Sequence, residues 1–313
     1  MHVLLIRHGQ SANNILEAEH GSGARFNQMR STDPPLSALG VQQANLLGKS
    51  LSAQLEGQRE NVSVFCSSMT RALQTVQPLS KELRVKTVVH PDVHEAKGFY
   101  DTSGKVVTGM SRAAIASKFP EYDASLVPQA GQGSETCLAA VQRAQRMAAQ
   151  LQSWAAEGGA AAERIVVIVS HCDFIGLLTR RLLFPSSTEV NAEVDDPEKL
   201  FQESYLWCNN TGISHLIVGA SPPAGSYPAK AHLLYWNRTD HLPERMRSGL
   251  NCKSLSCKAL ATWARAGDGG TGMKPKFSEV RVIHSPLPVR EGLIAAALGL
   301  ALAACAGRML RRA

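Results

Sequence analysis

Residues 3–14 read Val3-Leu4-Leu5-Ile6-Arg7-His8-Gly9-Gln10-Ser11-Ala12-Asn13-Asn14 and decide the fold of this chain. Four consecutive apolar residues predict a short strand that is buried on both faces, as in a parallel sheet. The strand ends at Arg7-His8-Gly9, and the carboxyl ends of such strands are where open α/β sheets bind ligands. An arginine fork beside an imidazole predicts a phosphate that is held by Arg7 and attacked by His8. On these three residues alone, a strand end with two solvated polar side chains is an equally good interpretation.

Predicted strands and helices alternate along the rest of the chain. Strands are expected over residues 62–66, 84–90, 164–170, 213–218 and 232–236, and helices over residues 37–55, from 67 onward, 134–156 and 174–184. This alternation predicts a three-layer α/β/α sandwich with a mostly parallel central sheet. The polar, glycine-containing residues 15–35 are expected to form a loop over the site, and residues 96–132 a cap insertion.

Five ordered blocks of sequence carry a resemblance to a known family. The first block, residues 7–14, matches the pattern Arg-His-Gly-x-Ser/Thr-x-x-Asn. The second and third blocks are residues 35–44 and residues 66–75. The fourth block is Glu95 with residues 133–135 and Arg143, and the fifth is Val169-Ser170-His171. In this order they resemble the histidine phosphatase (phosphoglycerate mutase-like) superfamily over about residues 1–240, and several blocks in order are more specific than one motif.

The resemblance implies a phosphatase reaction that needs neither a metal nor another cofactor. His8 is expected to be the nucleophile and to form a phosphohistidine that water hydrolyses. Glu95 is expected to protonate the leaving group and then to activate the water, which requires a raised pKa. His171 is expected to be the third catalytic residue beside His8 and Glu95. The predicted phosphate-binding residues are Arg7, Asn14, Arg71 and His171.

Each of these residues also has an ordinary structural interpretation when it is taken alone. Arg71 would more often be a charge on a helix surface, Glu95 a solvated loop residue, and His171 a histidine at a strand end. Cys172 departs from the glycine that commonly follows the second histidine in the family. Because its side chain is small, we expect a change in local packing and no loss of chemistry.

The sequence favours hydrolysis over a mutase reaction. Family mutases follow the acid with a Tyr-Gly-x-Leu-x-Gly-Leu-Asn-Lys-like segment and hold the substrate carboxylate with an arginine pair. Here Glu95 is followed by Ala-Lys-Gly-Phe-Tyr-Asp, and no Arg-Arg pair lies between residues 95 and 171. The expected partner is a small phosphorylated substrate or a phosphoprotein. The alternatives are a phosphoglycerate mutase-type phosphotransferase and a non-catalytic, membrane-anchored adaptor that keeps the fold.

The charge distribution and the cysteines limit the possible cellular location and binding partners of the protein. Residues 1–243 contain 21 Lys and Arg against 22 Asp and Glu, whereas residues 244–313 contain 12 against 4, so the tail accounts for the net charge of +7. That tail has few aromatic residues and no dense arginine run, which argues against nucleic-acid binding. The seven scattered cysteines indicate reduced thiols facing the cytosol. A strand that starts at residue 2 predicts that no N-terminal targeting segment is present.

The C-terminal part of the chain is expected to lie outside the catalytic domain of residues 1–240. Residues 241–290 are basic and rich in Gly, Ser and Pro, which predicts a linker. Residues 291–313 form an apolar segment whose uncharged run, 292–307, is followed by three arginines. A helix of this length would reach about 24 Å, short of the ~30 Å hydrocarbon core. Because the apolar run follows a linker and ends in arginines, we predict a tail anchor whose length only marginally spans a membrane. A buried core helix is the alternative.

Overall fold

The computed structural model describes residues 1–103, 105–157, 163–184, 206–219 and 231–249. The chain divides into a unit of Met1–Ile283 and a second unit of His284–Ala313. The second unit lies outside the described residues, as do the larger part of the predicted linker and the predicted tail anchor at 292–307.

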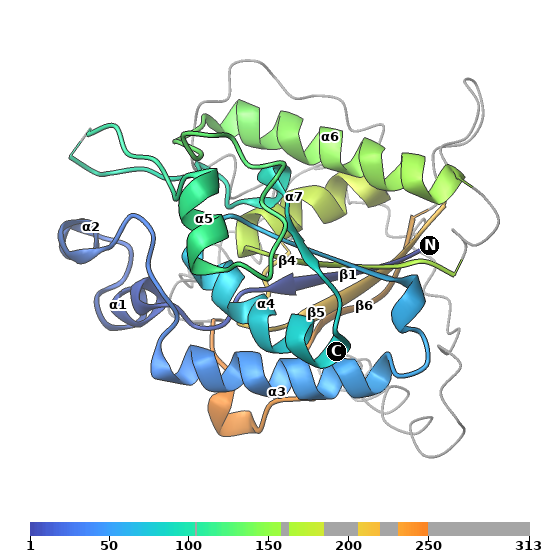
Figure 1. The fold of residues 1–313 in the computed structure, drawn as a ribbon. Helices are drawn as coiled ribbons and strands as arrows, with labels where there is room; N and C mark the ends of the chain where they lie inside the picture. The colour runs from blue at the N-terminus through green and yellow to red at the C-terminus, as the bar shows by residue number, and fades with distance from the viewer. Residues whose placement is uncertain (104, 158–162, 185–205, 220–230, 250–313) are drawn as a thin grey trace, which may run out of the picture. The chain divides into compact units, whose positions relative to one another are not determined.

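A six-stranded sheet forms the centre of the first unit (Figure 1). The strand order is β3-β2-β4-β1-β5-β6, in which β1 pairs in parallel with β4, and β2 pairs in parallel with both β4 and β3. Strands β5 and β6 complete one edge with antiparallel pairing. The predicted mostly parallel sheet is therefore confirmed, with strands β1 (His2–Arg7), β2 (Val62–Cys66), β3 (Thr87–Val89), β4 (Ile165–Ser170), β5 (Ile213–Val218) and β6 (Ala231–Arg238).

Helices cover both faces of this sheet and make the three predicted layers. Helices α3 (Ala38–Gln54) and α4 (Thr70–Leu83) lie on one face, and α6 (Cys137–Ala156) and α7 (Cys172–Leu183) lie on the other. Along β1, Val3 and Leu5 pack into the core under α6 and α7, whereas Leu4 and Ile6 pack into the core under α3 and α4. Strand β1 is buried on both faces because each of its apolar residues has a helix layer to pack against.

The predicted loop over residues 15–35 is wrong. The segment contains most of α1 (Ala12–His20) and all of α2 (Ala24–Met29). Helix α1 begins with a capping box, in which Ser11 and Asn14 satisfy each other's backbone amides. No residue of α1 or α2 is buried, so the sequence lacks the apolar periodicity by which helices are usually predicted.

Three other predicted elements have shifted boundaries. The strand predicted at 84–90 is limited to Thr87–Val89, because Arg84 adopts a left-handed conformation with φ of 57° as it ends α4. The helix predicted from residue 67 begins at Thr70, whose amide and hydroxyl both donate to the Asp33 carboxylate at 2.9 and 2.6 Å. The helix predicted from 134 begins at Cys137 with Thr136 as its cap. In the predicted cap, residues Arg112–Lys118 form a short helix, α5.

The described beginning of the predicted linker packs against the body of the first unit. The Gln43 side chain donates to the Met246 carbonyl at 2.7 Å and to the Ser248 hydroxyl at 2.9 Å. His241 lies 3.0 Å from the Thr211 hydroxyl. Residues 241–249 therefore belong structurally to the body.

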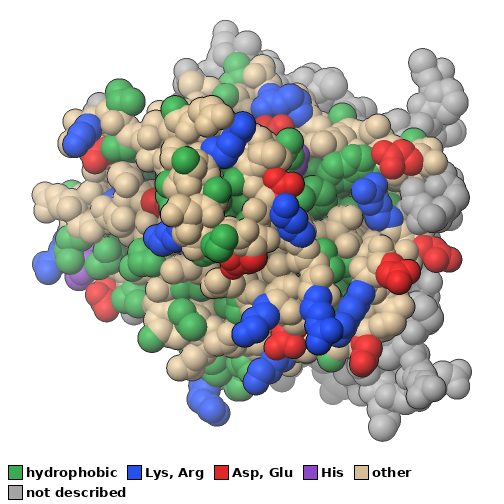
Figure 2. All heavy atoms as spheres, viewed as in Figure 1, with side chains coloured by type: hydrophobic (Ala, Val, Ile, Leu, Met, Phe, Trp, Pro, Cys, Tyr) green, Lys and Arg blue, Asp and Glu red, His purple; other side chains and the backbone are tan. Residues whose placement is uncertain are grey.

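The surface of this body is mixed in charge. On the face seen in Figure 2, Lys and Arg side chains are interspersed with Asp and Glu side chains, in keeping with the near balance of charges in residues 1–243. Among the described residues, no helix is both long enough and apolar enough to cross a membrane.

A close contact between Gly9 and Gly40 holds the turn after β1 against the start of α3. A Cβ added at Gly40 would lie 2.1 Å from the Gln10 carbonyl oxygen. We expect Gly40→Ala to lower the free energy of unfolding by about 1–3 kcal/mol, because the turn must move away from α3. Urea unfolding measures this change. Gly23→Ala, which meets open space, should stay within about 0.5 kcal/mol of the parent, and an equal loss in the two variants would contradict the argument.

Candidate active site

The carboxyl ends of the parallel strands bring the predicted site residues to one edge of the sheet. His8 follows β1 and His171 follows β4, and the His8 amide donates to the Ser170 carbonyl at 2.9 Å. The two imidazole rings lie 5.0 Å apart between centroids, tilted by 54°. Strand β2 leads into α4 with Arg71, and β3 leads through a 3₁₀ turn to Glu95. Ligand sites at this edge are typical of open α/β sheets.

The hydrogen bonds of His8 define which of its nitrogens can react. Nδ1 lies 2.7 Å from the carbonyl oxygen of Gly9, which can only accept, so the ring proton sits on Nδ1. Nε2 accepts from Nε of Arg71 at 3.2 Å. Burial, with the positive charges of Arg71 and Arg7, lowers the pKa of His8 well below its ordinary value. The imidazole is therefore neutral near pH 7, with its lone pair on Nε2.

His171 is buried completely and is oriented by a serine. Its Nε2 lies 2.9 Å from the hydroxyl of Ser67, and that hydroxyl already accepts from the Met69 amide. If the Ser67 hydroxyl proton is donated to Nε2, the ring proton of His171 sits on Nδ1. Nδ1 is buried and has no hydrogen-bond partner among the described residues. In that tautomer Nδ1 is a donor that a ligand oxygen could satisfy.

Arg71 and Arg7 are both buried next to His8, at 9% and 7% exposure. Arg71 is fixed by its bond to His8, and its own carbonyl accepts from the Thr75 hydroxyl at 2.6 Å. The Thr75 hydroxyl in turn accepts from the Gly9 amide at 2.9 Å. Thr75 therefore ties the helix that carries Arg71 to the turn that follows His8.

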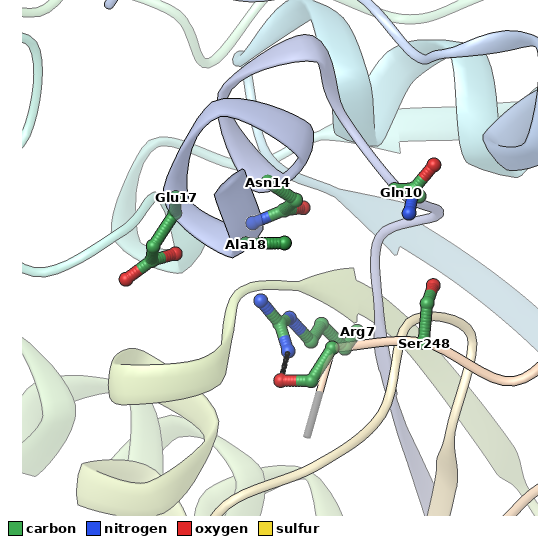
Figure 3. A pocket seen from close by; sticks show the side chains of 7 residues that line it. Arg7, Gln10, Asn14, Glu17, Ala18 and Ser248 are labelled. Atoms are coloured by element: carbon green, nitrogen blue, oxygen red, sulfur yellow. Dashed lines mark hydrogen bonds between the residues drawn. The ribbon is translucent and has the colours of Figure 1, made fainter. Parts of the chain in front are cut away.

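Arg7 is held mainly by backbone carbonyls. Its Nη1 donates to the carbonyl oxygens of Cys208 at 2.7 Å and Gly249 at 3.1 Å, while its Nε is buried without a partner among the described residues. Figure 3 shows this guanidinium below Asn14 of α1 and next to the segment that carries Ser248. One edge of Arg7 is used for structure, and the other remains available for a ligand.

A small polar pocket opens beside Arg7 (Figure 3). Its volume is about 40 Å³, and its lining consists of Arg7, Gln10, Asn14, Glu17, Ala18, Ser248 and Gly249. This volume holds more than one water molecule. Two predicted phosphate-binding residues, Arg7 and Asn14, thus share one pocket, whereas His8, Arg71, Glu95 and His171 do not line it.

The carboxyl group of Glu95 is positioned by backbone amides. Its Oε1 accepts from the amides of Ala96 at 2.9 Å and Phe174 at 3.1 Å. Burial raises the pKa of Glu95, while Arg71 and these two amides act in the opposite direction. A raised pKa is what a carboxylic acid needs to donate a proton near neutral pH.

A buried arginine holds the loop that presents Glu95. Arg143 is 2% exposed and donates to the carbonyl oxygens of His94 at 2.8 Å and Glu95 at 3.2 Å. It also forms an ion pair with Glu135 and lies 4.3 Å above the ring of Phe174. Arg143 therefore joins α6, the Glu95 loop and α7 in one polar network.

Several groups of the site were not predicted from the sequence. The carbonyls of Gly9, Cys208 and Gly249 act through the backbone, so no side-chain motif marks them. Asn210 was also missed, although its side chain donates to the His8 carbonyl at 3.0 Å and to Asn14 at 3.3 Å. Its amide side chain in the turn before β5 was the only available signal.

The described residues show no metal cluster. No group of three or more His, Cys, Asp or Glu side chains in that part of the chain is placed to hold a metal ion. The positive charge next to His8 comes from the two buried guanidinium groups.

Comparison with protein families identifies the class of this chain. The model of the histidine phosphatase superfamily (branch 1) matches residues 3–195, which is more than half of the 313 residues. The chain belongs to this superfamily, which confirms the predicted family. No curated protein sequence matches it significantly.

Solved structures with a related fold include several phosphatases. A mycobacterial glucosyl-3-phosphoglycerate phosphatase in complex with VO3 is 22% identical, with 76% of this chain and 99% of that chain covered and a TM-score of 0.46. A putative alpha-ribazole-5'-P phosphatase from Escherichia coli is 19% identical, with coverages of 76% and 96% and a TM-score of 0.45. A structure described as mycobacterial hydrolase 2 is 21% identical, with coverages of 83% and 97% and a TM-score of 0.47.

The lowered pKa of His8 has a measurable consequence for stability. Below about pH 6.5 the unfolded chain binds a proton at His8 that the folded protein does not bind, so the free energy of unfolding must fall as the pH decreases through this range. We expect His8→Asn to make this slope shallower by up to about 1.4 kcal/mol per pH unit. Urea unfolding at pH 7.5, 6.0 and 5.0 measures it, and an unchanged slope in the variant would show that His8 titrates normally.

Proposed function

We propose that this protein hydrolyses a phosphomonoester through a phosphohistidine intermediate on His8. The observation that carries the proposal is the bond from His8 Nδ1 to the Gly9 carbonyl, which leaves Nε2 unprotonated beside two buried arginines. A neutral imidazole with a fixed lone pair is a competent nucleophile. Guanidinium groups beside it can stabilise the charge of the transferring phosphoryl group without a metal ion.

Substrate binding in this mechanism requires a rearrangement of Arg71. In the unliganded site the lone pair of His8 Nε2 accepts from Arg71 Nε at 3.2 Å. An incoming phosphoryl group replaces this contact, so that Nε2 faces the phosphorus atom and Arg71 donates to the phosphoryl oxygens. Arg7, Asn14 and His171 supply further donors to those oxygens.

The proton balance of the reaction falls to Glu95. In the first half-reaction the protonated carboxyl group gives its proton to the leaving oxygen as His8 takes the phosphoryl group. In the second, the carboxylate accepts a proton from the water that attacks the phosphohistidine. Burial and the amides of Ala96 and Phe174 favour one fixed orientation of this carboxyl group for both steps.

We infer simple hydrolysis of a small phosphate ester or a phosphoprotein, in place of a mutase reaction. A mutase needs a second anchor to hold its doubly phosphorylated intermediate while it reorients. Among the cap residues, Arg112 donates to the Val127 carbonyl at 2.7 Å, and Lys105 and Lys118 are exposed. These groups are better explained as cap structure and solvated surface than as a second anion site.

The first test concerns the nucleophile. We expect His8→Ala to lower turnover of p-nitrophenyl phosphate, assayed with EDTA present, by at least about a thousandfold and to abolish phosphoenzyme formation. Rapid-quench labelling with a radioactive phosphate ester measures the intermediate, with His20→Ala as the control that keeps it. Acid-labile label that persists in His8→Ala would disprove the assignment.

The second test concerns the general acid. We expect Glu95→Gln to reduce turnover of an alkyl phosphate by about 10²–10⁴-fold, but turnover of p-nitrophenyl phosphate by less than about tenfold, because nitrophenolate leaves without a proton. Asp101→Asn, at a partly exposed position, serves as the matched control, in which neither ester should be affected. Equal losses on both esters in Glu95→Gln would show that another group donates the proton.

A further inference from the structure

Two cysteine side chains meet directly beside the predicted catalytic residues. Cys172 is the first residue of α7 and follows His171, and Cys208 lies in the turn before β5. The Cys208 thiol donates to the Cys172 sulfur at 3.9 Å, and the two residues are 1% and 8% exposed, respectively. Both are free thiols in this structure. They are far apart in sequence, so the fold itself brings them into contact.

The separation of these sulfur atoms is close to that of a disulfide. A disulfide requires about 2.05 Å between sulfurs, so the two atoms must approach by a further ~1.9 Å, which small side-chain rotations and shifts of the turn can supply. Cys66, in contrast, lies within β2 at 0% exposure. It provides a buried thiol for comparison.

The surroundings of Cys172 favour its thiolate, which is the form that reacts with oxidants. The hydrogen bond from Cys208 and the positive charge of Arg7 lower the pKa of the Cys172 thiol against the opposing effect of burial. The N-terminus of the twelve-residue helix α7 adds positive potential at the same position. Burial without such partners raises the pKa of the Cys66 thiol.

We propose that Cys172 and Cys208 form a reversible disulfide when the protein meets hydrogen peroxide. The Cys172 thiolate attacks one peroxide oxygen, the O–O bond breaks, and a sulfenic acid forms as hydroxide leaves. The Cys208 sulfur then attacks the sulfenic sulfur, the S–O bond breaks, and its oxygen leaves as water with the Cys208 proton. In total, two thiols lose two electrons and two protons, and one peroxide is reduced to two waters.

This disulfide acts on the site through Arg7. The Cys208 carbonyl is the closer of the two acceptors that hold Arg7 Nη1, at 2.7 Å, and Asn210 in the same turn donates to the His8 carbonyl at 3.0 Å. Drawing Cys208 toward α7 therefore shifts the support of Arg7 and His8 together. Displacements of about 1 Å can cost about a hundredfold in rate, so oxidation lowers turnover. This last step rests on the proposed phosphatase function, whereas the disulfide itself does not.

The experiment uses the full chain with Cys252, Cys257 and Cys305 replaced by serine. After peroxide treatment, digestion with trypsin without reductant should yield the fragment of residues 165–180 linked to that of residues 200–230, with a mass about 2 Da below their sum. Turnover of p-nitrophenyl phosphate should fall at least about tenfold and recover with dithiothreitol. Mass spectrometry decides the disulfide even if the protein proves to have no phosphatase activity.

Matched variants separate this pair from other thiols. Each variant is scored by the ratio of its oxidised to its reduced turnover, so differences in basal activity do not enter. Cys208→Ala should keep this ratio near one, and Cys66→Ser should respond as the parent does. Absence of the linked fragments in the oxidised parent overturns the disulfide, and linked fragments with unchanged turnover overturn its control of the site.

Discussion

The parallel pairing of β1 with β4 is the interaction on which the rest of the site depends. Its register sets Arg7 opposite Ser170, and the next peptide bond continues the ladder from the His8 amide to the Ser170 carbonyl. The two histidines therefore leave the sheet side by side, and their ring centroids are 5.0 Å apart. Because the apolar runs of both strands end at polar residues, a slip in register would draw Arg7 or Ser170 into the apolar core. The packing of the core thus fixes the relative positions of His8 and His171.

The site concentrates buried positive charge in a place where burial normally disfavours it. Arg7 and Arg71 stay charged because carbonyl oxygens, His8 Nε2 and the nearby carboxyl groups of Glu95 and Asp33 stabilise them. Burial, together with the charge of Arg71, lowers the pKa of both His8 and His171 and keeps them neutral. A dianionic phosphoryl group would offset this excess of positive charge, so the arrangement favours dianionic ligands.

The sequence predicts the parts of this structure that depend on side-chain pattern. Apolar runs located β1 and β4, and the residues after them located His8 and His171, because strand ends in a parallel sheet share an edge. Helices α1 and α2 could not be predicted in this way, since none of their residues enters the core. The partner of His8 Nδ1 is a backbone carbonyl, and every residue has one. Only the fold selects Gly9 for that role.

The C-terminal boundary of the described body also depends on a backbone contact that the sequence pattern does not reveal. A composition rich in Gly, Ser and Pro predicted a linker from residue 241, yet Gly249 places its carbonyl on Arg7. Its φ of 99° lies in the region that favours glycine, and an added Cβ would lie 2.6 Å from Nη1 of Arg7. Glycine here allows the backbone to approach a guanidinium closely, which is the opposite of a flexible spacer. Composition shows which residues can adopt such a conformation. The buried charge of Arg7 requires a carbonyl acceptor at this place, and glycine allows the backbone to supply it.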